Sequence, residues 1–155
     1  MNPRNENKIL VAGYITATNA TQAIHQFTED WPAATKAKDI NRLIDMVTDD
    51  VVFLPAGLPP IRGKEAVRGM YQNFFPQFSS IEQTVAIEEV VVAGDWAFSW
   101  GTETFVLSPT AGGPPIELQG RGLSILRRQR GGSWKFARGI NNRVAPKAAP
   151  QTGQE

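Results

Sequence analysis

The first half of the chain carries apolar residues at the spacing of helices. Within residues 19–38 the apolar side chains recur every three or four positions, as on one helical face: Ala23, Phe27, Trp31 and Ala34. Pro32 is expected to bend or break this helix, because proline lacks the backbone N–H and crowds the preceding turn. Asp39 then caps a second, short helix with an inward face of Ile40, Leu43, Ile44 and Val47.

A short strand and a third helix follow. Residues 51–54 are β-branched and aromatic and predict a strand, whereas the prolines within residues 55–60 predict a loop. Gly63 opens the third helix and Pro76 ends it. The apolar stripe of this helix is Ala66, Val67, Met70, Tyr71, Phe74 and Phe75.

From Ile81 onward the period of apolar residues changes to two. This alternation predicts strands over residues 85–92, 96–107, 117–129 and 134–142, separated by glycine-containing turns. Three helices followed by consecutive strands predict an α+β fold, with a curved antiparallel sheet wrapped around three N-terminal helices.

The same pattern predicts three regions along the chain. Residues 1–18 show no clear period and are expected to form an N-terminal arm. Residues 19–143 form the folded domain. Residues 144–155 are rich in Ala, Pro and Gln and predict a disordered tail.

Composition narrows the classes of function. The net charge is +1, from 16 basic and 15 acidic residues, so neither a nucleic acid nor an anionic membrane is expected as a partner. With no cysteine and one histidine, His25, no metal site is expected. Gly112 and Gly113 precede prolines rather than a helix, so we expect no nucleotide cofactor.

The chain contains no apolar run of the roughly 20 residues that a membrane span needs. Residues 9–15 resemble the apolar part of a signal peptide, but Gly13 and Tyr14 interrupt them. We therefore expect a cytoplasmic protein.

Five segments, in their order and spacing, resemble the nuclear transport factor 2-like superfamily, and most closely its SnoaL-like branch. They are KDINRL through TDDVVF at residues 38–53, IRGKEAV at 61–67, VAGDWA at 92–97, GRG at 120–122 and GSWKFAR at 132–138, followed by Asn141. The resemblance implies a cone-shaped domain around an internal pocket. This superfamily includes ketosteroid isomerases, epoxide hydrolases, dehydratases, polyketide cyclases and non-catalytic modules, so the fold alone does not give the function.

The resemblance also implies positions for the pocket residues. Trp31 stands where ketosteroid isomerases carry a first-helix tyrosine, Tyr71 matches a second tyrosine, and Ser124 stands near their second acid. Their aspartate base is replaced by Leu54 and Pro55, neither of which accepts a proton. Ketosteroid isomerisation is therefore not expected, and no catalytic residue is assigned. The predicted pocket lining is Trp31, Phe53, Tyr71, Phe75, Trp100, Thr102, Ser124 and Asn141.

Strand alternation assigns residues to the two faces of the predicted sheet. Phe98, Trp100, Thr102 and Thr104 share one face, and Trp100 is expected to line the pocket. In the last strand, the resemblance places Ala137, Gly139 and Asn141 on the concave face. Trp134, Phe136 and Ile140 then lie on the convex face. Because bulky apolar residues on an outer face need a cover, we predict a homodimer through the convex sheet face.

Alternation places Glu103 and Arg121 on the face opposite Trp100 and Ser124. An epoxide hydrolase would need an arginine bridging two carboxylates around a water molecule. A surface or interface ion pair between Glu103 and Arg121 is the simpler arrangement. Asp45, Asp49 and Asp50 are further carboxylates near the predicted mouth, which helix capping and solvation explain.

Two hypotheses about function remain open. In the first, the pocket binds or transforms a small apolar oxygen-bearing molecule that is polyketide-, terpenoid- or steroid-like, by an undetermined reaction. An enzyme of this kind would be a cyclase, isomerase or hydrolase without the usual aspartate base. In the second, the protein is a non-catalytic dimeric module for ligand binding or protein interaction.

Overall fold

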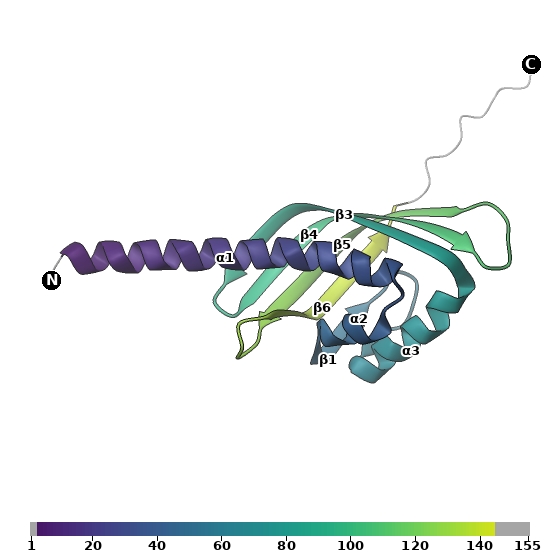
Figure 1. The fold of residues 1–155 in the computed structure, drawn as a ribbon, viewed down its shortest axis with the longest axis horizontal. Helices are drawn as coiled ribbons and strands as arrows, with labels where there is room; N and C mark the ends of the chain where they lie inside the picture. Colours follow the sequence, from purple (N-terminus) through teal and green to yellow (C-terminus); the bar gives the residue numbers. More distant parts are fainter. Residues whose placement is uncertain (1–2, 145–155) are drawn as a thin grey trace, which may run out of the picture.

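The computed structural model describes residues 3–144, with their side chains from residue 18 onward. Its first element is a long helix, α1 (Pro3–Lys36). Proline is favoured at a first helical position, because the backbone N–H there has no helical partner. The helix thus begins 16 residues before the predicted start at residue 19, and Figure 1 shows its first half extending beyond the sheet. Apart from Val144, the predicted tail lies outside the described residues.

The predicted break at Pro32 is wrong, because α1 continues through this residue to Lys36. Packing holds the last turn in place: Ala34 and Thr35 are buried, and the Thr35 hydroxyl donates to the Trp31 carbonyl at 3.0 Å. Lys38, with φ of 55°, then leaves the helical conformation. No helix in the described part of the chain is long and apolar enough to cross a membrane.

The next elements begin close to where the sequence predicts them. Asp39 caps α2 (Ile40–Asp45), with its side chain accepting from the Arg42 N–H at 3.0 Å. The strand β1 (Val47–Leu54) starts earlier than predicted and pairs with the short β2 (Ile61–Arg62). Gly63 precedes α3 (Lys64–Phe74), and Pro76 lies in the 3₁₀ turn η1 (Phe75–Gln77) that follows it.

Four long strands complete a six-stranded sheet: β3 (Phe78–Ala93), β4 (Trp96–Pro109), β5 (Ile116–Arg128) and β6 (Trp134–Arg143). The spatial order is β2-β1-β6-β5-β4-β3. Every neighbouring pair is antiparallel except β1 and β6, which run parallel, so the sheet is mixed. The predicted α+β class with three helices is confirmed.

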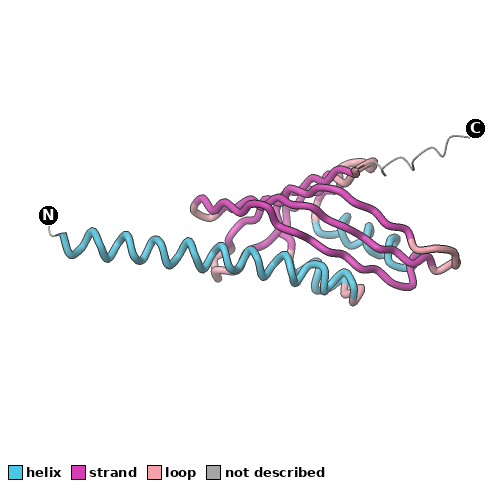
Figure 2. Tube along the Cα trace, turned by 90° about the horizontal axis from the view of Figure 1, so that it is seen from above, coloured by secondary structure: helices cyan, strands magenta, loops and turns pink. Residues whose placement is uncertain are grey.

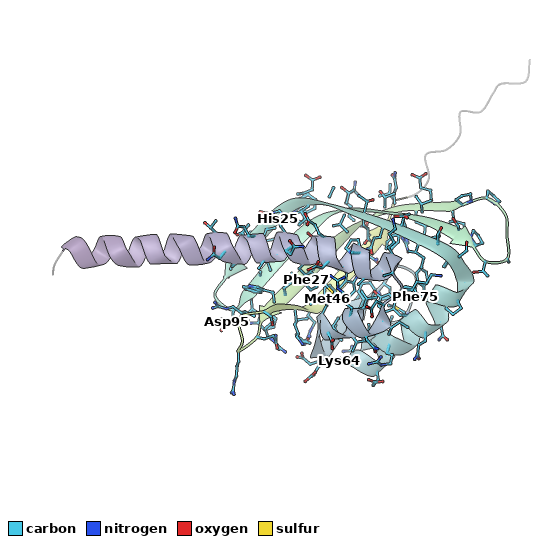
Figure 3. The ribbon with its side chains drawn as sticks, viewed as in Figure 1. His25, Phe27, Met46, Lys64, Phe75 and Asp95 are labelled. Atoms are coloured by element: carbon cyan, nitrogen blue, oxygen red, sulfur yellow. The ribbon has the colours of Figure 1, made fainter. Side chains whose placement is uncertain are left out.

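The sheet curves around α1, while α2 and α3 lie at one end (Figures 1 and 2). Register shifts in β3 at Ile87/Glu89 and in β6 opposite Ile125/Leu126 mark bulges, which bend and twist a strand. Phe27 on α1 lines the enclosed space and Phe75 after α3 is buried in the core, whereas His25 is exposed (Figure 3). The curvature leaves room between the helices and the concave face.

The face assignment of β4 differs from the prediction. Buried residues Ala97, Ser99, Gly101 and Leu107 face the helices, whereas Trp100 is 39% exposed. These residues lie on the side of the sheet that α1 contacts through β3 and β6. Glu103 therefore shares the concave face, contrary to the prediction.

The bulge also changes the face assignment of β6. Gly139 and Asn141 lie opposite Ser124 and Gly122 on the concave face, as predicted. Ala137 is then the extra residue, because Ile125 pairs with Arg138 and Leu126 with Phe136. Phe136 and Trp134 are therefore buried on the inner side, contrary to the prediction, while Ile140 is 50% exposed on the convex face.

Candidate functional site

A cavity of about 240 Å³ lies between α1, α3 and the concave face of the sheet. Its sheet side includes five residues with small or no side chains: Ser99, Gly101, Gly122, Ser124 and Gly139. A Cβ at Gly101 would run into the Ala86 carbonyl, and one at Gly139 into the Phe136 ring. Gly101 thus allows the Ala86 backbone to approach closely, and Gly139 makes room for the Phe136 ring.

Aromatic and aliphatic side chains from the helices and β1 form the opposite wall. The Trp31 ring centroid lies 5.6 Å from that of Phe136 and 6.5 Å from that of Tyr71. Phe27, Phe53, Val67, Met70 and Phe74 complete this wall. A cavity with such a lining suits an apolar ligand fixed by a few polar contacts.

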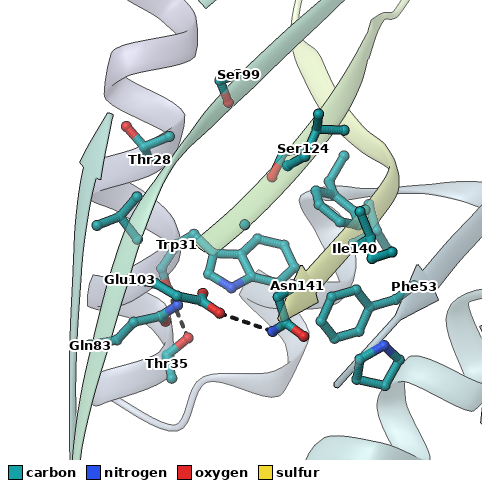
Figure 4. Close-up of a pocket in the computed structure, with 18 of the residues that line it drawn as sticks. Thr28, Trp31, Thr35, Phe53, Gln83, Ser99, Glu103, Ser124, Ile140 and Asn141 are labelled. Carbon is teal, nitrogen blue, oxygen red and sulfur yellow. Dashed lines mark hydrogen bonds between the residues drawn. The ribbon is translucent and has the colours of Figure 1, made fainter. Parts of the chain in front are cut away.

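Glu103 and Asn141 form a hydrogen-bonded pair in this cavity (Figure 4). Asn141 Nδ2 donates to Glu103 Oε1 at 2.9 Å. The Ala56 N–H donates to Asn141 Oδ1 at 2.7 Å, which fixes the orientation of the amide. The other carboxylate oxygen, Oε2, lies toward Gly122, where an added Cβ would be 3.9 Å away. Oε1 is thus held in place, whereas Oε2 lies beside Gly122, which also lines the cavity.

Burial raises the pKa of the Glu103 carboxyl group above its ordinary value. The Asn141 hydrogen bond and the positive charge of Arg143 oppose this shift in part. No lysine or arginine in the described part of the chain forms an ion pair with Glu103. A carboxyl group with a raised pKa is suited to accept and return a proton near neutral pH.

Tyr71 supplies a hydroxyl group to the same cavity. Burial is the main cause that raises its pKa, and the negative charge of Glu103 adds to the effect, so the phenol stays protonated. A hydrogen bond from Trp31 acts in the opposite direction. Because an indole N–H can only donate, the Tyr71 oxygen is the acceptor, and its own proton is left to donate to a ligand.

Gln83 adds a polar group at the side of the cavity near Trp31 and Thr35 (Figure 4). Its Oε1 atom is buried and has no hydrogen-bond partner among the described residues. A buried acceptor without a partner is costly. A ligand hydroxyl group would satisfy it.

The residues predicted for the pocket fall into two groups. Those bordering the cavity are Trp31, Phe53, Tyr71, Trp100, Ser124 and Asn141. The Trp100 indole, however, is on the convex side, where Nε1 donates to Glu89 at 2.8 Å. Phe75 packs behind Tyr71, with ring centroids 4.9 Å apart, and Thr102 is exposed.

Sequence reasoning missed Glu103, and the predicted pairing of Glu103 with Arg121 is wrong. Arg121 lies opposite Thr102 on the convex face and is exposed. The bridged carboxylates of the epoxide-hydrolase arrangement are therefore not formed around it. One signal in the sequence could have placed Glu103 on the inner face. Ser99 and Gly101 are small residues at every second position before it, and small residues mark the face of a strand that a helix covers.

Of the other candidate carboxylates, Asp45 is exposed, and Asp49 and Asp50 form ion pairs outside the cavity. Asp50 pairs with Arg127 and Arg138 at 2.9 and 3.3 Å, and Asp49 with Lys64 at 3.1 Å. In the described part of the chain, no three histidine, aspartate or glutamate side chains come together in a group that could hold a metal ion.

Comparison with known proteins places the chain in a family. The model of the SnoaL-like domain matches residues 28–137. A conserved protein from Planctomyces limnophilus is 33% identical, with 82% of this chain and 98% of that chain covered and a TM-score of 0.74. A ketosteroid isomerase-like protein from Erwinia carotovora atroseptica is 26% identical, with 81% and 96% covered and a TM-score of 0.71.

A more distant structure shares the fold. An NTF2-like protein with a cystatin-like fold from Novosphingobium aromaticivorans is 14% identical, with 89% of this chain and 90% of that chain covered and a TM-score of 0.74. No curated protein matches the sequence. The family match and the first relative together show that the chain belongs to the SnoaL-like domain family, a branch of the nuclear transport factor 2-like superfamily.

Proposed function

We propose that the protein is an enzyme that transfers a proton on a small apolar oxygen-bearing molecule, with Glu103 as general base and acid. The observation that carries this proposal is the Glu103 carboxyl group, which has a raised pKa, one oxygen held by Asn141 and the other facing an apolar cavity. The chemistry is proton removal next to a carbonyl group, as in isomerisation, cyclisation or dehydration of polyketide-, terpenoid- or steroid-like ligands.

In the proposed step, Glu103 Oε2 takes a proton from the carbon next to a ligand carbonyl. The electron pair of the broken C–H bond forms an enolate, and the Tyr71 hydroxyl stabilises its oxygen by donating a hydrogen bond. Glu103 then returns the proton to another carbon, or to a hydroxyl group that leaves as water. This arrangement compensates for Leu54 and Pro55, which cannot serve as the base.

Exchange of carbon-bound hydrogen in D₂O tests the proposal. Thermal shift first selects the cyclic ketone that stabilises the protein most among β-tetralone, α-decalone and progesterone. Mass spectrometry then measures deuterium uptake next to the carbonyl. Glu103→Gln should reduce the protein-catalysed rate by roughly 10²–10⁴-fold. Tyr71→Phe should reduce it by roughly 10²-fold, because one oxyanion donor is lost.

Glu117→Gln is the matched control, since Glu117 is an exposed carboxylate on β5. It should exchange the ketone at the wild-type rate. If a bound ketone exchanges equally fast with the wild-type protein and Glu103→Gln, the acid–base role is wrong. The pocket would then be a site for binding without turnover.

We further propose that the functional form is a homodimer through the convex sheet face. Four apolar residues lie side by side across this face, on β1, β6, β5 and β4: Leu54, Ile140, Leu123 and Trp100. Each is at least 37% exposed. The same row on a second copy, related by a two-fold axis, supplies an apolar surface that would cover all four. The oligomeric state in solution tests this proposal.

A further inference from the structure

Arg143 places a positive charge on the concave side of the sheet, next to Glu103. Across the strands, Val85 pairs with Glu103, Glu103 with Gly120, and Gly120 with Arg143. Paired residues share a face, so Glu103 and Arg143 project toward the same side. Arg143 and Glu103 are the only charged side chains that line the cavity in the described part of the chain.

Gly120 places no side chain between these two charges. It has no side chain, and a Cβ at this position would run into the Asn142 carbonyl. The backbone of Asn142 therefore takes the place of a side chain between Glu103 and Arg143.

The Arg143 guanidinium group is positioned but not neutralised. It lies over the Phe105 ring, 5.9 Å from the centroid, in a cation–π contact. Among the described residues no carboxylate forms an ion pair with it. The Arg143 side chain lines the cavity and is also exposed, so solvent reaches this end of the cavity. The N–H groups of Arg143 thus remain available to a ligand at this end.

We propose that Arg143 binds a carboxylate of the ligand, so that the natural substrates are apolar acids with the acid group at the mouth and the apolar body inside. The planar guanidinium group can hold a carboxylate through two parallel hydrogen bonds. The negative charge of Glu103 disfavours a carboxylate deeper in the cavity, which sets the direction of binding.

For the reaction that follows binding, this inference rests on the proposed function. The preference for an acid ligand does not depend on that reaction. A bound carboxylate would also offset the positive charge that lowers the Glu103 pKa. Glu103 would then be a stronger base with an acid ligand than with a neutral one.

The test compares two ligands of nearly the same shape, β-naphthoate and the neutral methyl β-naphthyl ketone. Isothermal titration calorimetry gives the Kd of each for the wild-type protein and three variants. The wild-type protein should bind the acid about tenfold more tightly than the ketone, as a charge-assisted hydrogen bond allows. Arg143→Gln should remove this preference and leave the Kd of the ketone within about twofold. Arg143→Lys should keep part of it, because lysine retains the charge but not the paired donors.

Arg130→Gln is the matched control, since Arg130 is exposed at the turn between β5 and β6. It removes the same charge far from the cavity and should keep the preference for the acid. Equal affinities of the wild-type protein for both ligands would overturn the proposal. An equal loss of both affinities in Arg143→Gln would overturn it as well.

Glu103→Gln separates this inference from the proposed reaction. The variant should keep the preference for β-naphthoate while it loses hydrogen exchange. A protein that catalyses exchange but shows no preference for the acid contradicts only the role of Arg143. A protein that prefers the acid, but whose exchange does not depend on Glu103, contradicts only the proposed reaction.

Discussion

The buried carboxyl group of Glu103 makes the stability of the protein depend on pH. Its pKa is raised in the folded protein, whereas in the unfolded chain it returns to about 4.5. Between these two values the folded state binds more protons than the unfolded state, so the free energy of unfolding falls as pH rises. The destabilisation is complete above the folded pKa and absent below 4.5.

Glu103→Gln should therefore be more stable than the wild-type protein at neutral pH, although under the proposed function it should be inactive. The amide has no proton to lose, and it can still accept a hydrogen bond from Asn141. Urea denaturation at a series of pH values measures the effect. The stability difference in favour of the variant should grow as the pH rises above about 4.5, the pKa in the unfolded chain. A stability difference that does not change with pH would mean that Glu103 has the same pKa in the folded and unfolded states. Glu117→Gln is the control, because it shows the effect of the same substitution at an exposed carboxylate.

At the level of elements, two glycines of the sheet that line the cavity, Gly122 and Gly139, differ in the atoms that surround them. A Cβ at Gly122 would meet only the Glu103 carboxylate, at 3.9 Å, whereas one at Gly139 would run into the Phe136 ring. We expect Gly122→Ala to change the free energy of unfolding by less than about 0.5 kcal/mol. Gly139→Ala should lower it by about 1–3 kcal/mol through overpacking. Thermal or urea unfolding of both variants makes the comparison.

Gly122→Ala should also act on ligand binding, because its methyl group enters the cavity beside Glu103 Oε2. We expect weaker binding of the selected ketone by this variant without loss of fold. Similar destabilisation by the two substitutions would contradict the packing described for Gly139. Unchanged ketone affinity in Gly122→Ala would place the ligand away from Glu103.

Local chemistry made most element boundaries predictable from the sequence. Asp39 caps α2, Gly63 precedes α3 and Pro76 follows it, because each residue acts within one turn of its own position. Strand faces were harder to predict. One extra residue, Ala137, reverses the alternation in β6, and no short-range pattern marks it. Glu103 was missed for a related reason, since the position of α1 decides which face of β4 is the inside.

At the level of the whole molecule, the convex face predicts a dimer that substitution can dissociate. Sedimentation equilibrium should give twice the mass of one chain for the wild-type protein. The double substitution Leu123→Glu and Ile140→Glu puts two carboxylates into the centre of the apolar row, and should yield a folded monomer. Leu58→Glu is the matched control, because Leu58 is 60% exposed but lies in the loop between β1 and β2, outside the row of strand residues. It should remain a dimer.

The dimer should also make thermal stability depend on protein concentration, because association favours the folded state by mass action. We expect the wild-type Tm to rise with concentration and the Tm of the double variant to stay constant. A stable dimer typically buries about 800 Å² on each partner. The row would therefore have to extend to Val52, Ile125, Phe98 and Val91, whose side chains alternate to the same face. A wild-type protein that sediments as a monomer and melts independently of concentration would exclude this interface.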